Sequence, residues 1–218
     1  YLSAQLAGLQ PAFPVLSEES AALPFEQRAA WSTYWLIDPL DGTKEFVKRN
    51  GEFTVNIALI NDHRPVLGVV YAPVLDVCYT AVSGQGAFKQ TSDLPPEPIR
   101  VKSNVGTPLK VVGSRSHASE AFTRYLGCLG PHDLVSIGSS LKLCLVADGS
   151  ADLYPRLGLT SEWDTAAAQC VVEAAGGSVT DLNGVPLAYN TKPSLLNPDF
   201  LVFGDQSRPW AEWARDAA

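Results

Sequence analysis

Residues 31–43 read Trp-Ser-Thr-Tyr-Trp-Leu-Ile-Asp-Pro-Leu-Asp-Gly-Thr, and they combine a strand signal with a cluster of acidic residues. Residues 31–37 are rich in aromatic and β-branched side chains, which predicts a strand. Pro39 has no N–H to give to a sheet, so we expect the strand to end there. Gly42 tolerates the backbone angles of a sharp turn. The stretch therefore predicts a strand that leads directly into a tight turn.

Two carboxylates, Asp38 and Asp41, lie three residues apart in this turn and are expected to face the same space. Mg²⁺ is usually held by few carboxylates and completes its shell with water and phosphate. Thr43 adds a hydroxyl where a helix could begin, and free backbone N–H groups there favour a phosphate. An ordinary surface turn is the alternative reading. A calcium EF-hand loop is excluded, because its third position requires Asp or Asn and Leu40 stands there.

The sequence on either side of this stretch divides into two halves. Apolar β-rich runs predict an antiparallel meander, with strands at residues 54–60, 66–72 and 77–82. A polar, proline-rich stretch at residues 91–98 is the expected boundary. Beyond it we expect strands at 109–113, 134–137, 151–154 and 178–180, and helices at 119–129, 140–147 and 164–175. The chain is thus expected to have a mainly antiparallel half, residues 1–98, and an α/β half, residues 99–218.

The composition indicates a compact globular protein and excludes intrinsic disorder. Of the 218 residues, 46% are hydrophobic and 18% are charged, which is enough apolar material for a large core. No apolar run approaches the ~20 residues that span a bilayer. The net charge of −7 argues against binding to a nucleic-acid polymer, which needs a surplus of Lys and Arg. We expect a soluble, cytoplasmic protein without stable membrane insertion.

The cysteine pattern indicates the redox state of the compartment, and the lack of methionine concerns the N-terminus. The four cysteines, Cys78, Cys128, Cys144 and Cys170, are widely spaced and form no Cys-x-x-Cys pair. This pattern favours buried thiols in a reducing compartment over disulfides or a zinc site. The sequence has no methionine and opens with Tyr1, so we expect that residues are missing at its front.

Two further acidic segments indicate a functional site only when they are considered together with the acidic turn. Glu18 and Glu19 follow a short apolar run and alone would indicate a solvated loop. Asp164 follows Trp163 and alone would indicate a helix N-cap.

Together, these segments resemble a known family. Residues 16–19, 38–43 and 163–167 are similar to the three metal-site motifs of the lithium-sensitive, Mg²⁺-dependent phosphatases that include inositol monophosphatase and fructose-1,6-bisphosphatase. Within that superfamily the bacterial bisphosphate nucleotidases are the most similar, through further matches at residues 38–60, 113–117, 136–142 and 196–198. The resemblance covers nearly the whole chain. It implies an α/β (α+β) fold, the layered αβαβα sandwich of these phosphatases.

The resemblance also implies a metal site. Its ligands would be Glu18, Asp38, Asp41, Asp164 and the backbone carbonyl of Leu40, with Asp38 bridging two positions. Glu18 would serve the first metal, and Asp41 and Asp164 the second. Two Mg²⁺ ions balance four carboxylates, so an acidic pocket can accept an anionic phosphate only with the cations in place. Two or more Mg²⁺ ions are therefore the expected cofactor.

The implied reaction is phosphomonoester hydrolysis by a metal-activated water, without a phosphoenzyme. Glu18, Thr43 and Asp38 are the expected catalytic residues, with Glu18 and Thr43 orienting and deprotonating the water. The expected substrate contacts are Asp41, Gly42, Thr43, Ser114, His117, Ser139, Ser140, Lys142 and Asp164. Arg156 is expected to approach the same pocket. For His117 a helix-capping role stays open, and for Lys142 a solvated helix charge does.

The expected substrate is adenosine 3′,5′-bisphosphate, cleaved to AMP and phosphate, or a related phosphosulfate, which implies a role in sulfur assimilation. The alternatives are an inositol or other sugar phosphate as substrate, and a silent binding protein on the same scaffold. A phosphatase of the haloacid dehalogenase type is disfavoured because it needs Asp-x-Asp, whereas Asp38 and Asp41 are separated by two residues. The resemblance further implies a preceding Thr-x-x-Asp element with one more acid. It leaves open the oligomeric state and a peripheral association with the inner membrane.

Overall fold

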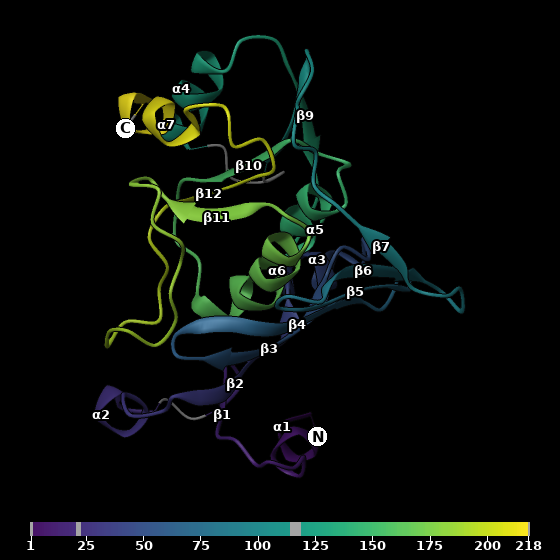
Figure 1. Cartoon of the computed structure of the whole chain (residues 1–218), viewed down its shortest axis with the longest axis vertical. Coiled ribbons are helices and arrows are strands. Elements are labelled where there is room, and N and C mark those ends of the chain that lie inside the picture. Colours follow the sequence, from purple (N-terminus) through teal and green to yellow (C-terminus); the bar gives the residue numbers. More distant parts are fainter. Residues whose placement is uncertain (1, 21–22, 114–118, 218) are drawn as a thin grey trace.

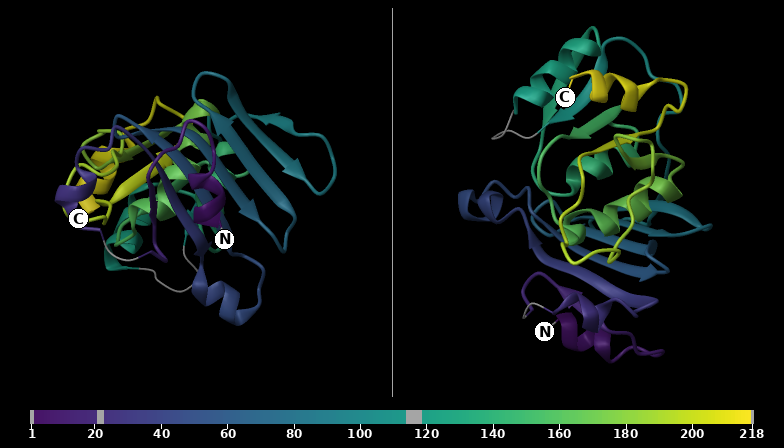
Figure 2. Two further views of the ribbon diagram at one scale, coloured as in Figure 1. Left: turned by 90° about the horizontal axis from the view of Figure 1, so that it is seen from below. Right: turned by 90° about the vertical axis from the view of Figure 1, so that its left-hand side faces the viewer.

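The computed structural model describes residues 2–20, 23–113 and 119–217. In this part of the chain, two sheets alternate with three layers of helix, and the two chain ends lie at opposite ends of the stack (Figures 1 and 2). The order helix, sheet, helix, sheet, helix confirms the expected layered αβαβα sandwich of mixed α and β structure.

The first sheet has seven strands among the described residues, arranged in sequence order. The first pair is parallel and all later pairs are antiparallel, so the expected meander is present and extends further on both sides. The strands are β1 (Val15–Ser17), β2 (Thr33–Asp41), β3 (Thr54–Asn61), β4 (Arg64–Ala72), β5 (Val77–Val82), β6 (Gly86–Thr91) and β7 (Glu97–Ile99).

The second sheet has five strands among the described residues, in the order β11, β12, β10, β8, β9. Its parallel core is β8 with β9 and β10, whereas β12 runs antiparallel to both of its neighbours. The sequence analysis missed β12. The strands are β8 (Leu109–Gly113), β9 (His132–Ser136), β10 (Leu153–Arg156), β11 (Ser178–Asp181) and β12 (Phe200–Phe203).

The helices fill the spaces around the sheets (Figure 1). α5 and α6 lie between the sheets, α4 and α7 cover the outer face of the second sheet, and α1 lies against the first. The helices are α1 (Leu2–Ala7), α2 (Phe25–Arg28), α3 (Thr43–Lys48), α4 (Glu120–Cys128), α5 (Leu141–Ala147), α6 (Glu162–Ala174) and α7 (Trp210–Ala217).

The strand periodicity explains why these layers form. Successive side chains of a strand point to opposite faces. In β2, Tyr34 and Leu36 enter the core between the two sheets, whereas Trp35 and Ile37 join Leu6 of α1 on the other face. A third cluster lies between the second sheet and the pair α4 and α7. β2 is thus apolar on both faces because both faces are covered.

The expectation that the strand ends at Pro39 is wrong. β2 runs through Pro39 to Asp41, and its pairing with β3 is irregular between Asp38 and Asp41, so no ladder bond needs the missing N–H. The stretch at residues 91–98 does not leave the first sheet, because Pro98 lies in the edge strand β7. The division of the chain at residue 98 stays a prediction.

The thiols fit the expectation in part. Cys144 and Cys170 are buried, Cys78 is half-buried, and none of the four cysteines forms a disulfide. Cys128 is exposed, which corrects the expectation of a buried thiol, because it lies at the solvent-facing end of α4. Within the described ranges, no helix combines the length and the apolar content that crossing a bilayer requires.

Gly68 lets α6 approach β4 closely, and this contact is testable. A Cβ at Gly68 would lie 2.2 Å from the carbonyl oxygen of Ala167 and 2.9 Å from the Cβ of Cys170. We expect Gly68→Ala to lower the free energy of unfolding by about 1–3 kcal/mol, the usual cost of overpacking, in urea denaturation.

The matched control is Gly127→Ala on the exposed side of α4, where an added Cβ meets nothing within 4 Å. This change should be neutral or stabilise by about 0.5–1 kcal/mol, because alanine has the better helix propensity. Equal unfolding free energies for both variants would contradict the close-packing argument.

Candidate active site

Three carboxylates converge between the two halves of the chain. Asp38 and Asp41 belong to β2 and Asp164 to α6, and one oxygen of each lies within 4.8 Å of the others. Carboxylate oxygens at this spacing are the donors that a hard divalent cation prefers. The cluster is consistent with divalent-metal binding.

Asp38 is the most buried of the three, with 1% of its surface exposed. Its Oδ1 accepts the backbone N–H of Leu40 at 2.8 Å, which holds the turn after the strand. Burial raises the pKa of Asp38 to about 9, and the nearby charge of Asp41 adds to the rise. The metal-free site therefore disfavours ionised carboxylates, and a bound cation would reverse this preference.

Asp41 is held by residues from elsewhere in the chain. Its Oδ2 accepts the backbone N–H of Ser140 at 2.6 Å, the Thr54 hydroxyl at 3.3 Å and the Asn56 amide at 3.3 Å. Burial raises the pKa of Asp41, whereas the charge of Lys142 and these hydrogen bonds oppose the rise. The carboxylate thus has a fixed orientation toward the site.

Thr54 and Asn56 were not singled out individually by the sequence analysis. Both side chains point inward from β3, on the same face as Ala58 and Ile60, and both are buried. The sequence did contain a pattern that could have pointed to them, because a polar residue on the buried face of a strand needs a hydrogen-bond partner. The Ser140 hydroxyl provides one, 2.8 Å from Asn56 Oδ1.

Asp164 is the third residue of α6, so the helix starts earlier than expected. Ser161 is the N-cap, and its backbone N–H donates to Asp164 Oδ2 at 2.8 Å in a capping box. The N-cap reading of Asp164 is therefore wrong, because the residue three positions earlier takes that place. Burial raises the pKa of Asp164 to about 7, and the charge of Asp41 adds to this.

Glu18 lies beside this cluster and is exposed. It follows β1, and its backbone N–H donates to the carbonyl of Ile37 at 3.3 Å, next to Asp38. Its charge contributes to the raised pKa of Asp38 and of Asp164. Glu19 is also exposed. Among the described residues, Glu18 is not one of the three carboxylates that lie within 4.8 Å.

A cavity of about 160 Å³ opens beside the carboxylates. It is lined by six of the expected substrate residues and by Arg156: Asp41, Gly42, Ser139, Ser140, Lys142 and Asp164. Thr43 begins α3 directly after the N-cap Gly42, which has a φ of +92° that glycine tolerates. Ser114 and His117 lie outside the described residues.

Lys142 is part of the pocket rather than a solvated helix charge. Its Nζ donates to the carbonyl of Ser139 at 2.6 Å and lies 5.8 Å from the centroid of the Tyr154 ring. Burial lowers the pKa of Lys142, whereas the charge of Asp41 raises it. Arg156 donates to the carbonyl of Leu159 at 2.5 Å, which holds its guanidinium at the wall of the same cavity.

Comparisons with known proteins identify the family of this chain. The model of the inositol monophosphatase family matches residues 1–208. The 3′(2′),5′-bisphosphate nucleotidase CysQ of Escherichia coli (strain K12) is 54% identical over 197 residues, which cover 90% of this chain and 78% of that protein. The protein of the same name from Haemophilus influenzae is 41% identical over 211 residues, covering 96% of this chain and 78% of the other.

A solved structure gives the same result. The crystal structure of CysQ from Bacteroides thetaiotaomicron, a bacterial member of the inositol monophosphatase family, matches with a TM-score of 0.85 and 43% identity. The match covers 94% of this chain and 81% of that chain. The resemblance found in the sequence is thereby confirmed, and the chain belongs to the inositol monophosphatase family.

Proposed function

We propose that this chain removes the 3′-phosphate of adenosine 3′,5′-bisphosphate, giving AMP and phosphate, with the help of Mg²⁺. The observation that carries the proposal is one cavity lined by two of the three clustered carboxylates, Asp41 and Asp164, and by two cationic side chains, Lys142 and Arg156. The name of the relatives at 54% and 41% identity supports the nucleotide substrate. A cytoplasmic location and a role in sulfur assimilation stay predictions.

The carboxylate site fits Mg²⁺ ions, which we propose are held by Glu18, Asp38, Asp41, Asp164 and the carbonyl of Leu40. Two ions would balance the four carboxylates, and their charge would oppose the rise in pKa that burial and the neighbouring Asp41 cause at Asp38 and Asp164. When bound, the cations would lower the pKa of water and stabilise the charge that develops on the phosphate oxygens.

Two residues of this chain would then accept a proton from the attacking water and hold that water in position. We assign proton acceptance to the Glu18 carboxylate, which is exposed, and orientation of the water to the Thr43 hydroxyl. The water oxygen forms a bond to phosphorus while the bond from phosphorus to the 3′-oxygen breaks. That oxygen leaves in line and takes a proton from solvent water, while the proton of the attacking water goes to Glu18. The proposed metal ligands come from both halves of the chain, since Asp38 and Asp41 lie in the first half and Asp164 in the second.

The second phosphate of the substrate explains the cationic wall of the cavity. The ammonium group of Lys142, in the first turn of α5, is a compact charge suited to a phosphate oxygen, and Ser139 lies just before this helix. An inositol monophosphate has no second phosphate for Lys142 and Arg156. Contacts from Ser114 and His117 stay predictions.

The substrate assignment is tested by phosphate release. With Mg²⁺ present, we expect adenosine 3′,5′-bisphosphate to be hydrolysed with at least about 10-fold higher kcat/KM than inositol 1-phosphate, about 1.4 kcal/mol of discrimination. Asp41→Asn should reduce kcat by at least about 100-fold, the upper end for residues that only support metal ligands. Asp133→Asn, at an exposed position of β9, is the control. A preference for the inositol ester would overturn the assignment.

Lys142 should decide the preference for a second phosphate. We expect Lys142→Gln to raise KM for the bisphosphate about 10-fold or more, since a charged hydrogen bond contributes about 1.5–3 kcal/mol. KM for adenosine 3′-monophosphate, which lacks the 5′-phosphate, should change much less. The exposed Lys110 of β8 gives the control Lys110→Gln. Equal KM changes for both nucleotides would show that Lys142 does not bind the second phosphate.

The raised pKa of Asp38 predicts that the metal-free protein loses stability as the pH rises. Because the folded state keeps this proton up to a pKa of about 9 and the unfolded chain releases it near 3.8, stability falls between these values. In EDTA at pH 8, Asp38→Asn should therefore raise Tm by at least about 2–4 °C, corresponding to about 1 kcal/mol. The gain should shrink toward pH 5.

With Mg²⁺ added, the wild type should have a higher Tm than Asp38→Asn, because a cation that binds the folded state stabilises the wild type more than the variant. Differential scanning calorimetry with and without Mg²⁺ measures both effects. A lower Tm for Asp38→Asn in EDTA at pH 8 would contradict the burial of an unfavourable charge.

A further inference from the structure

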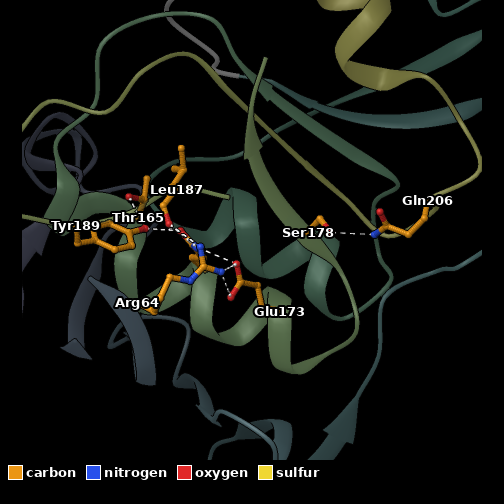
Figure 3. Close-up of polar contacts among 8 residues, drawn as sticks. Arg64, Thr165, Glu173, Ser178, Leu187, Tyr189 and Gln206 are labelled. Atoms are coloured by element: carbon orange, nitrogen blue, oxygen red, sulfur yellow. Dashed lines mark hydrogen bonds and ion pairs between the residues drawn. The ribbon is translucent and has the colours of Figure 1, made fainter. Parts of the chain in front are cut away.

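A chain of buried polar side chains runs along one face of α6. Thr165, Gln169 and Glu173 are four residues apart, so they follow one another on the same face. The Tyr189 hydroxyl bridges the first two, lying 3.2 Å from Thr165 Oγ1 and 2.5 Å from Gln169 Oε1 (Figure 3). Gln169 Nε2 donates to Glu173 Oε1 at 2.8 Å. Thr165, Gln169 and Tyr189 are almost completely buried.

An ion pair lies at the outer end of this row of hydrogen-bonded side chains. Arg64 of β4 donates to both carboxylate oxygens of Glu173, at 3.1 and 3.3 Å, and to the carbonyl of Leu187 at 3.2 Å (Figure 3). Both partners of this pair are partly exposed. The Glu173 oxygens therefore act as hydrogen-bond acceptors toward both Arg64 and Gln169.

That acceptor sets the direction of the hydrogen bonds that Gln169 and Tyr189 donate. Gln169 must turn its amide nitrogen to Glu173, so its Oε1 accepts the hydroxyl proton of Tyr189. The Tyr189 oxygen can then accept from Thr165, whose own oxygen accepts from the Asn197 amide at 3.0 Å. The Thr165 hydroxyl proton has two acceptors at the same distance of 3.2 Å, the Tyr189 oxygen and the carbonyl of Glu162.

The inner end of this row of hydrogen-bonded side chains reaches the first turn of α6, which carries Asp164. The Asn197 amide also donates to the carbonyl of Ser161 at 2.8 Å, and the backbone N–H of Asn197 donates to the carbonyl of Thr160 at 2.8 Å. Ser161 in turn holds Asp164 Oδ2 through its backbone N–H. The row of hydrogen bonds thus ends at Ser161, one hydrogen bond away from the carboxylate of Asp164.

We propose that Tyr189 is a positioning residue for the divalent-cation site, acting through Thr165, Asn197 and the first turn of α6 on Asp164. The inference rests on the proposed function, since it needs Asp164 to bind a cation. Tyr189 itself does not line the cavity, so its effect would be indirect. A merely structural network would stabilise the core without changing the affinity for metal.

The experiment measures metal binding without catalysis. The metal-free full chain is titrated with Mn²⁺, and the free ion is followed by its electron paramagnetic resonance signal. We expect Tyr189→Phe to raise the Kd for Mn²⁺ about 10-fold, within the range typical of residues that support metal ligands. Its ring still fills the same space, so the fold is retained.

The matched control is Tyr125→Phe. Tyr125 is as buried as Tyr189, and its hydroxyl donates to the carbonyl of Trp210 at 3.1 Å in the layer of α4 and α7. Both variants lose a buried, hydrogen-bonded hydroxyl, with two partners for Tyr189 and one for Tyr125, but only Tyr189→Phe should weaken Mn²⁺ binding. Wild-type affinity in Tyr189→Phe, or an equal loss in Tyr125→Phe, would overturn the inference. A wild type that binds no Mn²⁺ would instead overturn the proposed function, and the inference with it.

A second pair of variants tests the hydroxyl link itself. Thr165→Val keeps the shape of the side chain but removes the oxygen between Asn197 and Tyr189. It should weaken Mn²⁺ binding as Tyr189→Phe does, whereas Thr165→Ser retains the hydroxyl and should restore the affinity. Equal Kd values for the Val and Ser variants would contradict transmission through this oxygen.

Discussion

The hydrogen bond from the Ser140 N–H to Asp41 Oδ2 joins the two halves of the chain at the site. Asp41 ends a strand of the first sheet, and Ser140 begins the helix that lies against the second. Because a buried carboxylate is costly unless donors surround it, this bond and those from Thr54 and Asn56 offset part of the cost. The site therefore exists only when the two sheets are packed together.

The acids of the site were visible in the sequence because each lies in a local pattern. Asp38 and Asp41 share one turn, and Asp164 follows Trp163 before a helix of small residues. Their supports were not visible, since Thr54 and Asn56 meet Ser140 across more than eighty residues. Lys142 was ambiguous for the same reason: its burial depends on the Tyr154 ring from another strand.

Local rules also failed where tertiary structure overrides them. Proline normally ends a strand, yet β2 continues past Pro39 because its pairing with β3 is already irregular there. The strand β12 has a simple apolar sequence, Phe-Leu-Val-Phe, but too short a run to be distinguished from a buried turn by periodicity. The strands β3 to β5 were easier to predict, because each is a longer run rich in β-branched residues.

The spacing between the acids depends on how closely α6 approaches the first sheet. Small side chains, Ala166, Ala167 and Ala168, are completely or almost completely buried on this helix, and Gly68 of β4 leaves no room for a methyl group. A larger residue at this contact would push the helix away from the sheet. Asp164 would then move away from Asp38 and Asp41, which belong to the sheet. The same close packing that fills the core therefore sets the distance between carboxylates that must share a cation.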